Sequence, residues 1–478
     1  MLGHMVSKHP VIIQGGMGAG VSCWRLAQAV SQLGQLGVVC GIALDLILAR
    51  RLQDGDPGGH MRRGLDRFPF PKMAERIWQK YYTPGGKSEN EPYKSLPQHS
   101  LDSPRQLVEL CIVSNFVEVT LAREGHDHPV GINYLEKIQI PHLSSLYGAM
   151  LAGVAYVLMG AGIPLKIPGV LDRLANHEPA SYKLQVTGAQ DSDDSTIHFA
   201  PRDFMERELP PLLRPNFLAI VASNTLAVTL CKKANGRVDG FVVEGPTAGG
   251  HNAPPRGKLQ LDEAGEPIYG ERDIVDLEEI RELGLPFWLA GGYGTAERLR
   301  GARAAGATGV QVGTAFAFCA ESGLRDEYKQ ALLKKSSSGE AKVFTDPLAS
   351  PTDYPFKTAQ LEDTLSEREV YLAGPRVCDL GYLREPYRTP AGTIDNRCAA
   401  EPLTVYLSKG GQEVKTLGRK CLSNALLANI GHPQVRAGKF VERGLVTCGD
   451  DLSEITSFLP PNRLVYSAAD AIAKLLNA

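Results

Sequence analysis

The segment that decides the fold is residues 240–257, GFVVEGPTAGGHNAPPRG. It begins with a short apolar run, Gly240–Glu244, which predicts a buried strand, and glycines and prolines typical of turns follow. Gly249 and Gly250 let the backbone approach a flat ligand closely, because no Cβ stands in the way. His251 comes next, and histidine is the side chain best suited to move a proton near neutral pH. The segment therefore predicts a strand that ends at a ligand pocket.

Seven more short apolar runs rich in β-branched residues alternate with segments of helical periodicity. This alternation is typical of βα units around a parallel sheet. The eight predicted strands cover residues 11–14, 37–40, 130–133, 156–159, 217–221, 240–244, 287–290 and 309–312. Eight such units predict an α/β fold, a (β/α)₈ TIM barrel, with a doubly wound open sheet as the alternative.

The positions of the unusual residues favour the barrel. A barrel carries its functional residues at the C-terminal ends of several strands, whereas an open sheet gathers them at one switch point. Here glycines and polar residues follow strands spread along the whole chain: residues 14–17, Asn133, Gly160, residues 244–251, Gly291 with Gly292, and Gly313 with Thr314. We therefore expect the site at the C-terminal end of a barrel.

Parts of the chain exceed a minimal barrel. The predicted barrel domain covers residues 1–323 and contains an insertion over about 54–126, whose first part, 54–104, is dense in proline, glycine, tyrosine and charge. A hairpin excursion is predicted over about 180–200, where two alternating runs flank Asp191–Asp194. Residues 324–478 are predicted to form a C-terminal extension, partly helical, that packs on the barrel.

The composition excludes some classes of partner. The 478 residues include 51 Lys and Arg against 53 Asp and Glu, for a formal net charge of -2. A protein that binds nucleic acid or a membrane surface would show a basic excess, so neither partner is expected. Lys8, His9 and Pro10 interrupt any apolar signal-peptide core, and no apolar run reaches the ~20 residues that span a bilayer. We expect a cytoplasmic protein.

Nine cysteines are scattered along the chain, an odd number that is typical of a reduced compartment. Four of them, Cys378, Cys398, Cys421 and Cys448, lie in the predicted extension, and four thiolates can hold zinc or an iron–sulfur cluster. No C-x-x-C pair occurs, however, so buried free thiols are the preferred interpretation. No metal site is predicted, although the sequence leaves this alternative open.

Two glycine-rich turns follow consecutive predicted strands, at residues 291–295 (GGYGT) and 313–314 (GT). Loops at these positions of a barrel commonly form a phosphate site, in which backbone N–H groups and a helix N-terminus face the anion. One such turn would by itself indicate only a tight connection, but two in succession favour phosphate. Thr295 is also a predicted N-cap. Together with the glycines before His251, the turns predict a flat cofactor with a phosphate tail, flavin mononucleotide (FMN).

Taken together, these motifs resemble the nitronate monooxygenase family, formerly called 2-nitropropane dioxygenases, which is related to the FMN-dependent enoyl-acyl-carrier-protein reductases. The resemblance covers roughly residues 10–320. It rests on residues 14–18 (QGGMG), 131–133 (GIN), 244–251 (EGPTAGGH), 290–292 (AGG) and 310–314 (VQVGT). Residues 350–357, SPTDYPFK, resemble a longer variety of the family.

The resemblance implies a barrel that binds one FMN non-covalently at its C-terminal face, with His251 as the catalytic base or proton donor. It implies flavin contacts from Gly16, Met17, Asn133, Glu244, Gly249 and Gly250, and phosphate contacts from Gly291, Gly292, Gly313 and Thr314.

Three functions follow as hypotheses. The first is oxidation of alkyl nitronates with O₂, in which His251 acts as acid or base. The second is an enoyl-thioester reductase that uses NAD(P)H, in fatty-acid or polyketide biosynthesis, with His251 as proton donor. The third is a flavin-binding assembly protein without catalysis. We expect the first, although the histidine and the glycines serve the first two equally. The expected partner is a small molecule, a nitronate or an enoyl thioester; NAD(P)H, an acyl carrier protein and a homodimer stay open.

Overall fold

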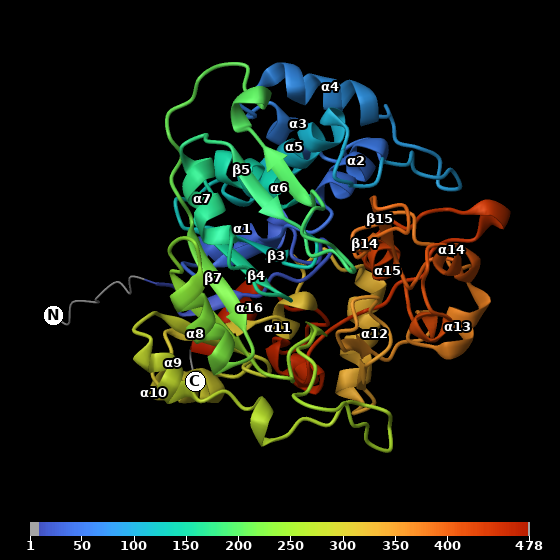
Figure 1. The fold of residues 1–478 in the computed structure, drawn as a ribbon. Helices are drawn as coiled ribbons and strands as arrows, with labels where there is room; N and C mark the ends of the chain where they lie inside the picture. The colour runs from blue at the N-terminus through green and yellow to red at the C-terminus, as the bar shows by residue number, and fades with distance from the viewer. Residues whose placement is uncertain (1–8, 477–478) are drawn as a thin grey trace.

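The computed structural model describes residues 9–476, and its centre is a barrel of eight parallel strands (Figure 1). The strands are β1 (Ile12–Gln14), β2 (Gly37–Cys40), β3 (Val130–Leu135), β4 (Tyr156–Gly160), β7 (Asn216–Val221), β8 (Gly240–Glu244), β10 (Phe287–Ala290) and β11 (Gly309–Val312). They pair in the order β1-β11-β10-β8-β7-β4-β3-β2, and a parallel bridge between Ile13 and Leu36 joins the two ends of the sheet. The predicted TIM barrel is confirmed, and the open sheet is wrong. Lys8 and residues 477–478, which fall within predicted segments, lie outside the described residues.

The strands are buried on both faces, which explains why they read as continuous apolar runs. One cluster fills the barrel interior and includes the fully buried residues Ile13, Leu158, Val242 and Trp288. The indole Nε1 of Trp288 donates a hydrogen bond to the Pro10 carbonyl at 2.8 Å. A much larger apolar cluster lies between the strands and the surrounding helices. Burial on both sides holds the strand ends, and therefore the site, in fixed positions.

Helices cover the outside of the barrel between successive strands. They are α1 (Trp24–Gln32), α5 (Arg105–Ala122), α6 (His142–Leu151), α7 (Ile167–Ala175), α8 (Asn224–Lys233), α9 (Leu277–Glu282) and α10 (Ala296–Ala304). The predicted N-cap of α10 is confirmed, because the Thr295 hydroxyl accepts a hydrogen bond from the backbone N–H of Arg298. In the part of the chain that the structure describes, no helix has the length and apolar character needed to cross a membrane.

Additional elements flank this ring. Between β2 and α5 the chain forms α2 (Leu44–Gln53), α3 (His60–Leu65) and α4 (Pro71–Tyr81), drawn in blue at the top of Figure 1. Between α7 and β7 it forms an antiparallel hairpin of β5 (Ala180–Lys183) and β6 (Thr196–Phe199), followed by the 3-10 turn η1 (Pro201–Phe204). Between β8 and α9 lie β9 (Gly250–His251) and the 3-10 turn η2 (Glu271–Asp273).

The chain after β11 makes a long excursion and then returns to the barrel. It forms α11 (Thr314–Ala317), α12 (Asp326–Ser337), β12 (Val343–Asp346), β13 (Phe356–Ala359), α13 (Arg368–Ala373), β14 (Glu385–Arg388), β15 (Ile394–Arg397), α14 (Leu403–Ser408), η3 (Glu413–Thr416), α15 (Leu422–Asn429), η4 (Ala437–Lys439), η5 (Asp450–Phe458) and α16 (Ala468–Leu476). The last helix, α16, packs against α1 and α10, so it occupies the eighth helix position of the barrel.

A second small sheet joins this excursion to the loop after β8. Its order is β12-β13-β9, and all its pairs are antiparallel. Phe356 pairs with His251, and Lys357 pairs with Gly250. The backbone of the predicted catalytic histidine is therefore held by a strand that lies about a hundred residues further along the chain.

Candidate active site

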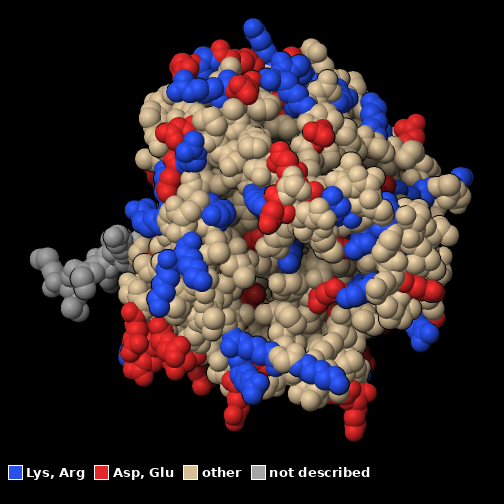
Figure 2. Space-filling view, in the orientation of Figure 1, with Lys and Arg blue, Asp and Glu red and all other residues tan. Residues whose placement is uncertain are grey.

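The predicted site residues lie around one pocket at the C-terminal ends of the barrel strands. The eleven residues that line it as predicted are Gly16, Met17, Asn133, Glu244, Gly249, Gly250, His251, Gly291, Gly292, Gly313 and Thr314. Figure 2 shows the molecule hollowed near the middle of one face, with basic and acidic side chains at the edge of the hollow. The sequence thus identified residues that the fold brings together, while their individual roles stay predictions.

Sequence reasoning missed a second group of pocket residues, all from the segment after β11. They are Phe356, Tyr382, Leu383, Ser423, Leu426, Thr447, Cys448, Gly449 and Asp451. Nothing in their spacing links them to the barrel loops. Only the 350–357 motif, which contains Phe356, gave a signal that this part of the chain belongs to the site.

His251 is the central polar group of the pocket. Its Nε2 lies 2.7 Å from the Ser350 hydroxyl, and its ring meets the edges of Phe356 and Tyr354 at centroid distances of 4.9 and 6.5 Å. Burial lowers the pKa of His251 to about 4. The imidazole is therefore neutral at pH 7, a state in which it accepts a proton.

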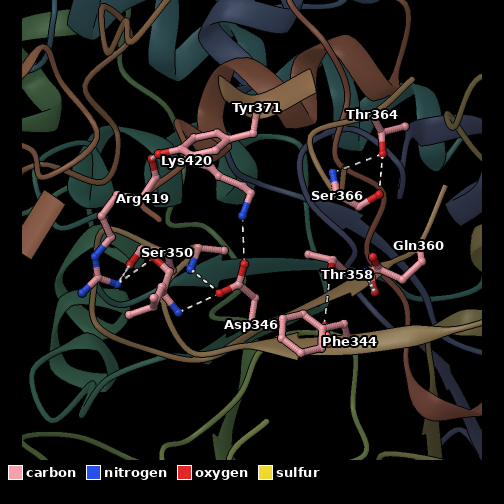
Figure 3. A network of polar contacts seen from close by, with 12 residues as sticks. Phe344, Asp346, Ser350, Thr358, Gln360, Thr364, Ser366, Tyr371, Arg419 and Lys420 are labelled. Atoms are coloured by element: carbon pink, nitrogen blue, oxygen red, sulfur yellow. Dashed lines mark hydrogen bonds and ion pairs between the residues drawn. The ribbon is translucent and has the colours of Figure 1, made fainter. Parts of the chain in front are cut away.

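A polar network fixes the loop that carries Ser350 (Figure 3). The carboxylate of Asp346 accepts hydrogen bonds from the backbone N–H groups of Leu348 and Ala349, at 2.8 and 3.0 Å, and from Lys420 at 2.8 Å. The guanidinium of Arg419 donates to the carbonyl of Leu348 at 3.0 Å and to the carbonyl of Ser350. These bonds hold the Ser350 hydroxyl against the histidine.

Two polar side chains face the pocket without partners. Glu244 ends β8, and no described residue pairs with its carboxyl group, whose pKa burial raises to about 7. The side-chain carbonyl oxygen of Gln311, on β11, is buried without a hydrogen bond within the described residues. Unpaired buried polar atoms are costly. Polar edges of a bound flavin ring would satisfy them, so this side of the pocket fits FMN.

Glycine is needed at the different positions of the pocket for different physical reasons. Gly291 and Gly292 adopt φ of +90° and +69°, a region that favours glycine, and a Cβ on Gly291 would lie 2.9 Å from the Thr247 hydroxyl. A Cβ on Gly249 would lie 2.6 Å from the carbonyl carbon of Cys448. Gly249 therefore admits the returning C-terminal segment, a reason that the sequence did not reveal. Gly250, with φ +79°, has open space where a Cβ would be.

The turn after β10, between the strands that carry Glu244 and Gln311, fits a phosphate. The turn at Gly291 and Gly292 adjoins Arg298, whose guanidinium donates to the Gly292 carbonyl and pairs with Glu454 at 3.5 Å. The hydroxyl of Thr314 accepts a hydrogen bond from the N–H of Gly449 at 3.0 Å. Asp451 lines the same pocket, and burial raises the pKa of its carboxyl group.

The four cysteines of the metal hypothesis are divided by the fold. The thiol of Cys378 is in hydrogen-bonding contact with those of Cys398 and Cys421, whereas Cys448 lines the pocket. All four are free thiols. Over residues 9–476, no group of three His, Cys, Asp or Glu side chains is arranged to hold a metal ion.

The fold and the site together define a class of protein, a TIM-barrel-like protein with its pocket at the C-terminal ends of the strands. Residues 213–347 match the sequence profile of the nitronate monooxygenase family. The nitronate monooxygenase of Pseudomonas aeruginosa PAO1 is 33% identical over 139 residues, which are 29% of this chain and 36% of that protein. The chain thus matches only about a third of the length of this relative. These matches confirm the predicted resemblance to the nitronate monooxygenase family of flavin-dependent oxidoreductases.

Solved structures with a similar arrangement were also found. FabK from Thermotoga maritima has a TM-score of 0.49 and 16% identity, and the match covers 98% of this chain and 91% of that one. The enoyl reductase domain of MlnA from the macrolactin biosynthesis cluster of Bacillus amyloliquefaciens has a TM-score of 0.49 and 12% identity, with 98% and 93% covered. Nitroalkane oxidase from Streptomyces ansochromogenes has a TM-score of 0.41 and 17% identity, with 73% and 76% covered. Scores this low carry no conclusion about function.

Proposed function

We propose that this protein is an FMN-dependent oxidoreductase that reduces enoyl thioesters. The observation that carries the choice of substrate is a second hollow beside the active site. Leu383 lines both cavities, and the second one encloses about 550 Å³ between the barrel mouth and the C-terminal segment. A small nitronate would leave this space without an occupant, whereas the carrier of a thioester is a long polar chain that fits it.

The residues present support FMN as the cofactor. The turn at Gly291 and Gly292 would hold its phosphate, with Arg298 behind the turn. The unpaired groups of Glu244 and Gln311 would face the polar edge of its ring. When bound, FMN supplies the transfer of a hydride or of single electrons, which no side chain performs readily.

The residues of the chain itself orient the substrate and move the proton. Phe356, Leu383 and Leu426 form an apolar wall that excludes water from the reacting carbon atoms. His251 donates a proton to the α-carbon, and Ser350 holds the imidazole in place at 2.7 Å. Because the resting imidazole is neutral, His251 would take up a proton from solvent as negative charge develops on the thioester and raises its pKa, and would pass that proton to the α-carbon.

Oxidation of alkyl nitronates is the second candidate. The family match over residues 213–347 favours it. A nitronate has already lost its α-proton, so in this reaction the neutral imidazole of His251 would bind and orient the nitro group rather than act as a base. The third hypothesis, an assembly protein without catalysis, is less well supported, because the glycines and the histidine that chemistry requires all line the pocket.

Anaerobic mixing of the purified yellow protein with single reactants tests the proposal. Under the reductase hypothesis, NADPH or NADH bleaches the flavin absorbance, and a crotonyl thioester then restores it. Restoration should fail in His251→Ala, although this variant should retain the FMN content of the wild type. Bleaching by a propionate nitronate alone, with oxygen uptake once air is admitted, would instead select nitronate oxidation. A protein that cannot take up FMN would disprove both.

A further inference from the structure

We propose that the second hollow is a binding site for the phosphate group of the substrate's carrier arm, which Lys137 and Arg384 hold. The inference rests on the proposed reduction of enoyl thioesters and extends it to the chemistry of the carrier. The ligand is a chain of amide groups that ends in a phosphate, as in coenzyme A or in the phosphopantetheine arm of an acyl carrier protein.

The charges around the hollow leave an excess of two cations. Six charged residues line it, of which Arg397 pairs with Glu385 at 3.0 Å and Lys415 pairs with Asp353 at 3.1 Å. Neither Lys137 nor Arg384 pairs with a carboxylate among the described residues. An anionic ligand would balance both at once.

Arg384 is the more informative of the two cations. Its side chain is partly buried, and its guanidinium donates only to backbone carbonyls, that of His99 at 2.6 Å and that of Gly381 at 3.2 Å. Burial lowers the pKa of Arg384, although the charges of Asp395 and Glu401 oppose this, and neither carboxylate forms an ion pair with the guanidinium. A guanidinium has five N–H donors, so donors remain for a phosphate oxygen.

Lys137 connects the hollow to the site of proton transfer. Its ammonium group lies 5.6 Å from the ring centroid of Tyr354, and that ring lies 6.5 Å from the ring of His251. Lys137 therefore stands one aromatic side chain away from the catalytic residue. Pro351 and Thr352 line the hollow next to Ser350, the residue that contacts His251. The hollow thus lies beside the loop that contacts the histidine, and Leu383 lines both the hollow and the pocket.

The remaining lining fits the amide part of such an arm. The exposed residues Gln185 and Gln412 line the hollow, and amide side chains both donate to and accept from the amide groups of a ligand. Gln139 also lines it, but its side-chain amide already donates to Glu136 and accepts from the backbone N–H of Gln185. A ligand that carried only a carboxylate would account for the two cations but not for the amide side chains. The combination of amides and cations favours an arm that contains amides and ends in phosphate.

Direct binding tests the site without any turnover. The purified holoprotein is titrated by calorimetry at low salt with 4′-phosphopantetheine and with pantetheine, which lacks only the phosphate. We expect tighter binding of the phosphorylated compound, and roughly tenfold weaker binding of it to Lys137→Gln, which loses one charge-assisted contact. Pantetheine should bind equally to both proteins. Arg384→Lys, which keeps the charge but loses the fork of donors, should give an intermediate loss.

The matched control is Lys474→Gln, which removes an exposed lysine on α16, outside the lining of the hollow. Equal affinity of the wild type for the two compounds, or equal losses in Lys137→Gln and Lys474→Gln, would overturn the proposal. A comparison of coenzyme A with 4′-phosphopantetheine identifies the source of the arm: tighter binding of coenzyme A indicates the free nucleotide form, and equal binding indicates the carrier protein. Both results support the site.

Failure of this proposal is distinguishable from failure of the proposed function. Reduction of crotonyl thioesters without any preference for the phosphate would overturn the binding site alone. Preference for the phosphate without reduction of any enoyl thioester would overturn the reductase function and leave the site supported.

Discussion

The Nε2 atom of His251 lies 2.7 Å from the hydroxyl of Ser350, a residue 99 positions further along the chain. The same hydroxyl lies 2.8 Å from that of Thr352 and accepts a hydrogen bond from the Thr352 backbone N–H at 3.2 Å. The barrel supplies the histidine, and the segment after the barrel sets its orientation.

Replacement of Ser350 by alanine should slow the reaction without weakening substrate binding. The hydroxyl contacts the histidine, so its loss misplaces the imidazole, and kcat should fall roughly tenfold to a hundredfold with little change in KM. Ser350→Thr, which keeps the hydroxyl, should recover much of the activity. Steady-state kinetics of both variants checks this, and an equal fall in both would show that the serine matters for packing only.

Arg419 should act on the same step from a greater distance. Its guanidinium donates to the carbonyls of Leu348 and Ser350, so Arg419→Gln should release the loop and lower kcat about as much as Ser350→Ala does. Because the two residues act as one unit, the double variant should be little worse than either single one. Additive losses in the double variant would contradict this coupling.

Gly249→Ala should destabilise the docking of the C-terminal segment. The new Cβ would lie 2.6 Å from the carbonyl carbon of Cys448, which is backbone and cannot move aside cheaply. We expect a loss of about 1–3 kcal/mol in the free energy of unfolding, measured by urea denaturation. The control is Gly301→Ala, on the exposed side of α10 with open space around it, which should stabilise the protein by about 0.5–1 kcal/mol. Equal changes in the two variants would disprove the steric argument.

The charge of Glu244 should make stability depend on pH. Burial raises its pKa from 4.5 to about 7, so the folded state binds this proton more tightly than the unfolded state does. The contribution of this proton to the free energy of unfolding is complete below pH 4.5 and is lost as the pH rises through 7. In the cofactor-free protein, the free energy of unfolding of Glu244→Gln minus that of the wild type should therefore rise by about 1–3 kcal/mol between pH 4.5 and pH 7.5. Urea denaturation at both pH values measures this difference, and a constant difference would refute it.

Arg298 should contribute to affinity for the cofactor only through the phosphate. Arg298→Gln should weaken the binding of FMN roughly tenfold, while the binding of riboflavin, which lacks the phosphate, should not change. Quenching of flavin fluorescence on binding measures both affinities. An equal loss for both flavins would show that the arginine shapes the turn at Gly292 instead.

The barrel could be predicted from the sequence because its signals are local. Each strand is a short apolar run that is buried on both faces, and each strand end carries glycines or polar residues that a strand interior would not. The convergence of Gly16, Asn133, His251 and Gly313 at one pocket follows from the fold class alone, since parallel strands in a barrel end on the same face. Local pattern and topology together were therefore sufficient for this half of the site.

The other half could not be predicted, because it depends on contacts between distant segments that have no periodic pattern. Tyr382, Leu426 and Cys448 reach the pocket from loops and a short helix, and their positions follow from packing rather than spacing. Gly249 illustrates the difference. The sequence predicted that a flat ligand lies against this glycine, whereas the neighbour that a Cβ would meet is the backbone of Cys448.

The position of α16 between α1 and α10 has a consequence for how the chain is made. During synthesis, the apolar faces of these two helices stay uncovered until residues 468–476 have emerged from the ribosome, about 150 residues after the last barrel strand. A nascent chain with all eight strands is thus still an incomplete barrel with exposed apolar surface, the kind of intermediate that aggregates or binds chaperones. Closure of the helical ring therefore depends on translation of α16, so a ribosome that stalls in the long excursion leaves the apolar faces of α1 and α10 uncovered.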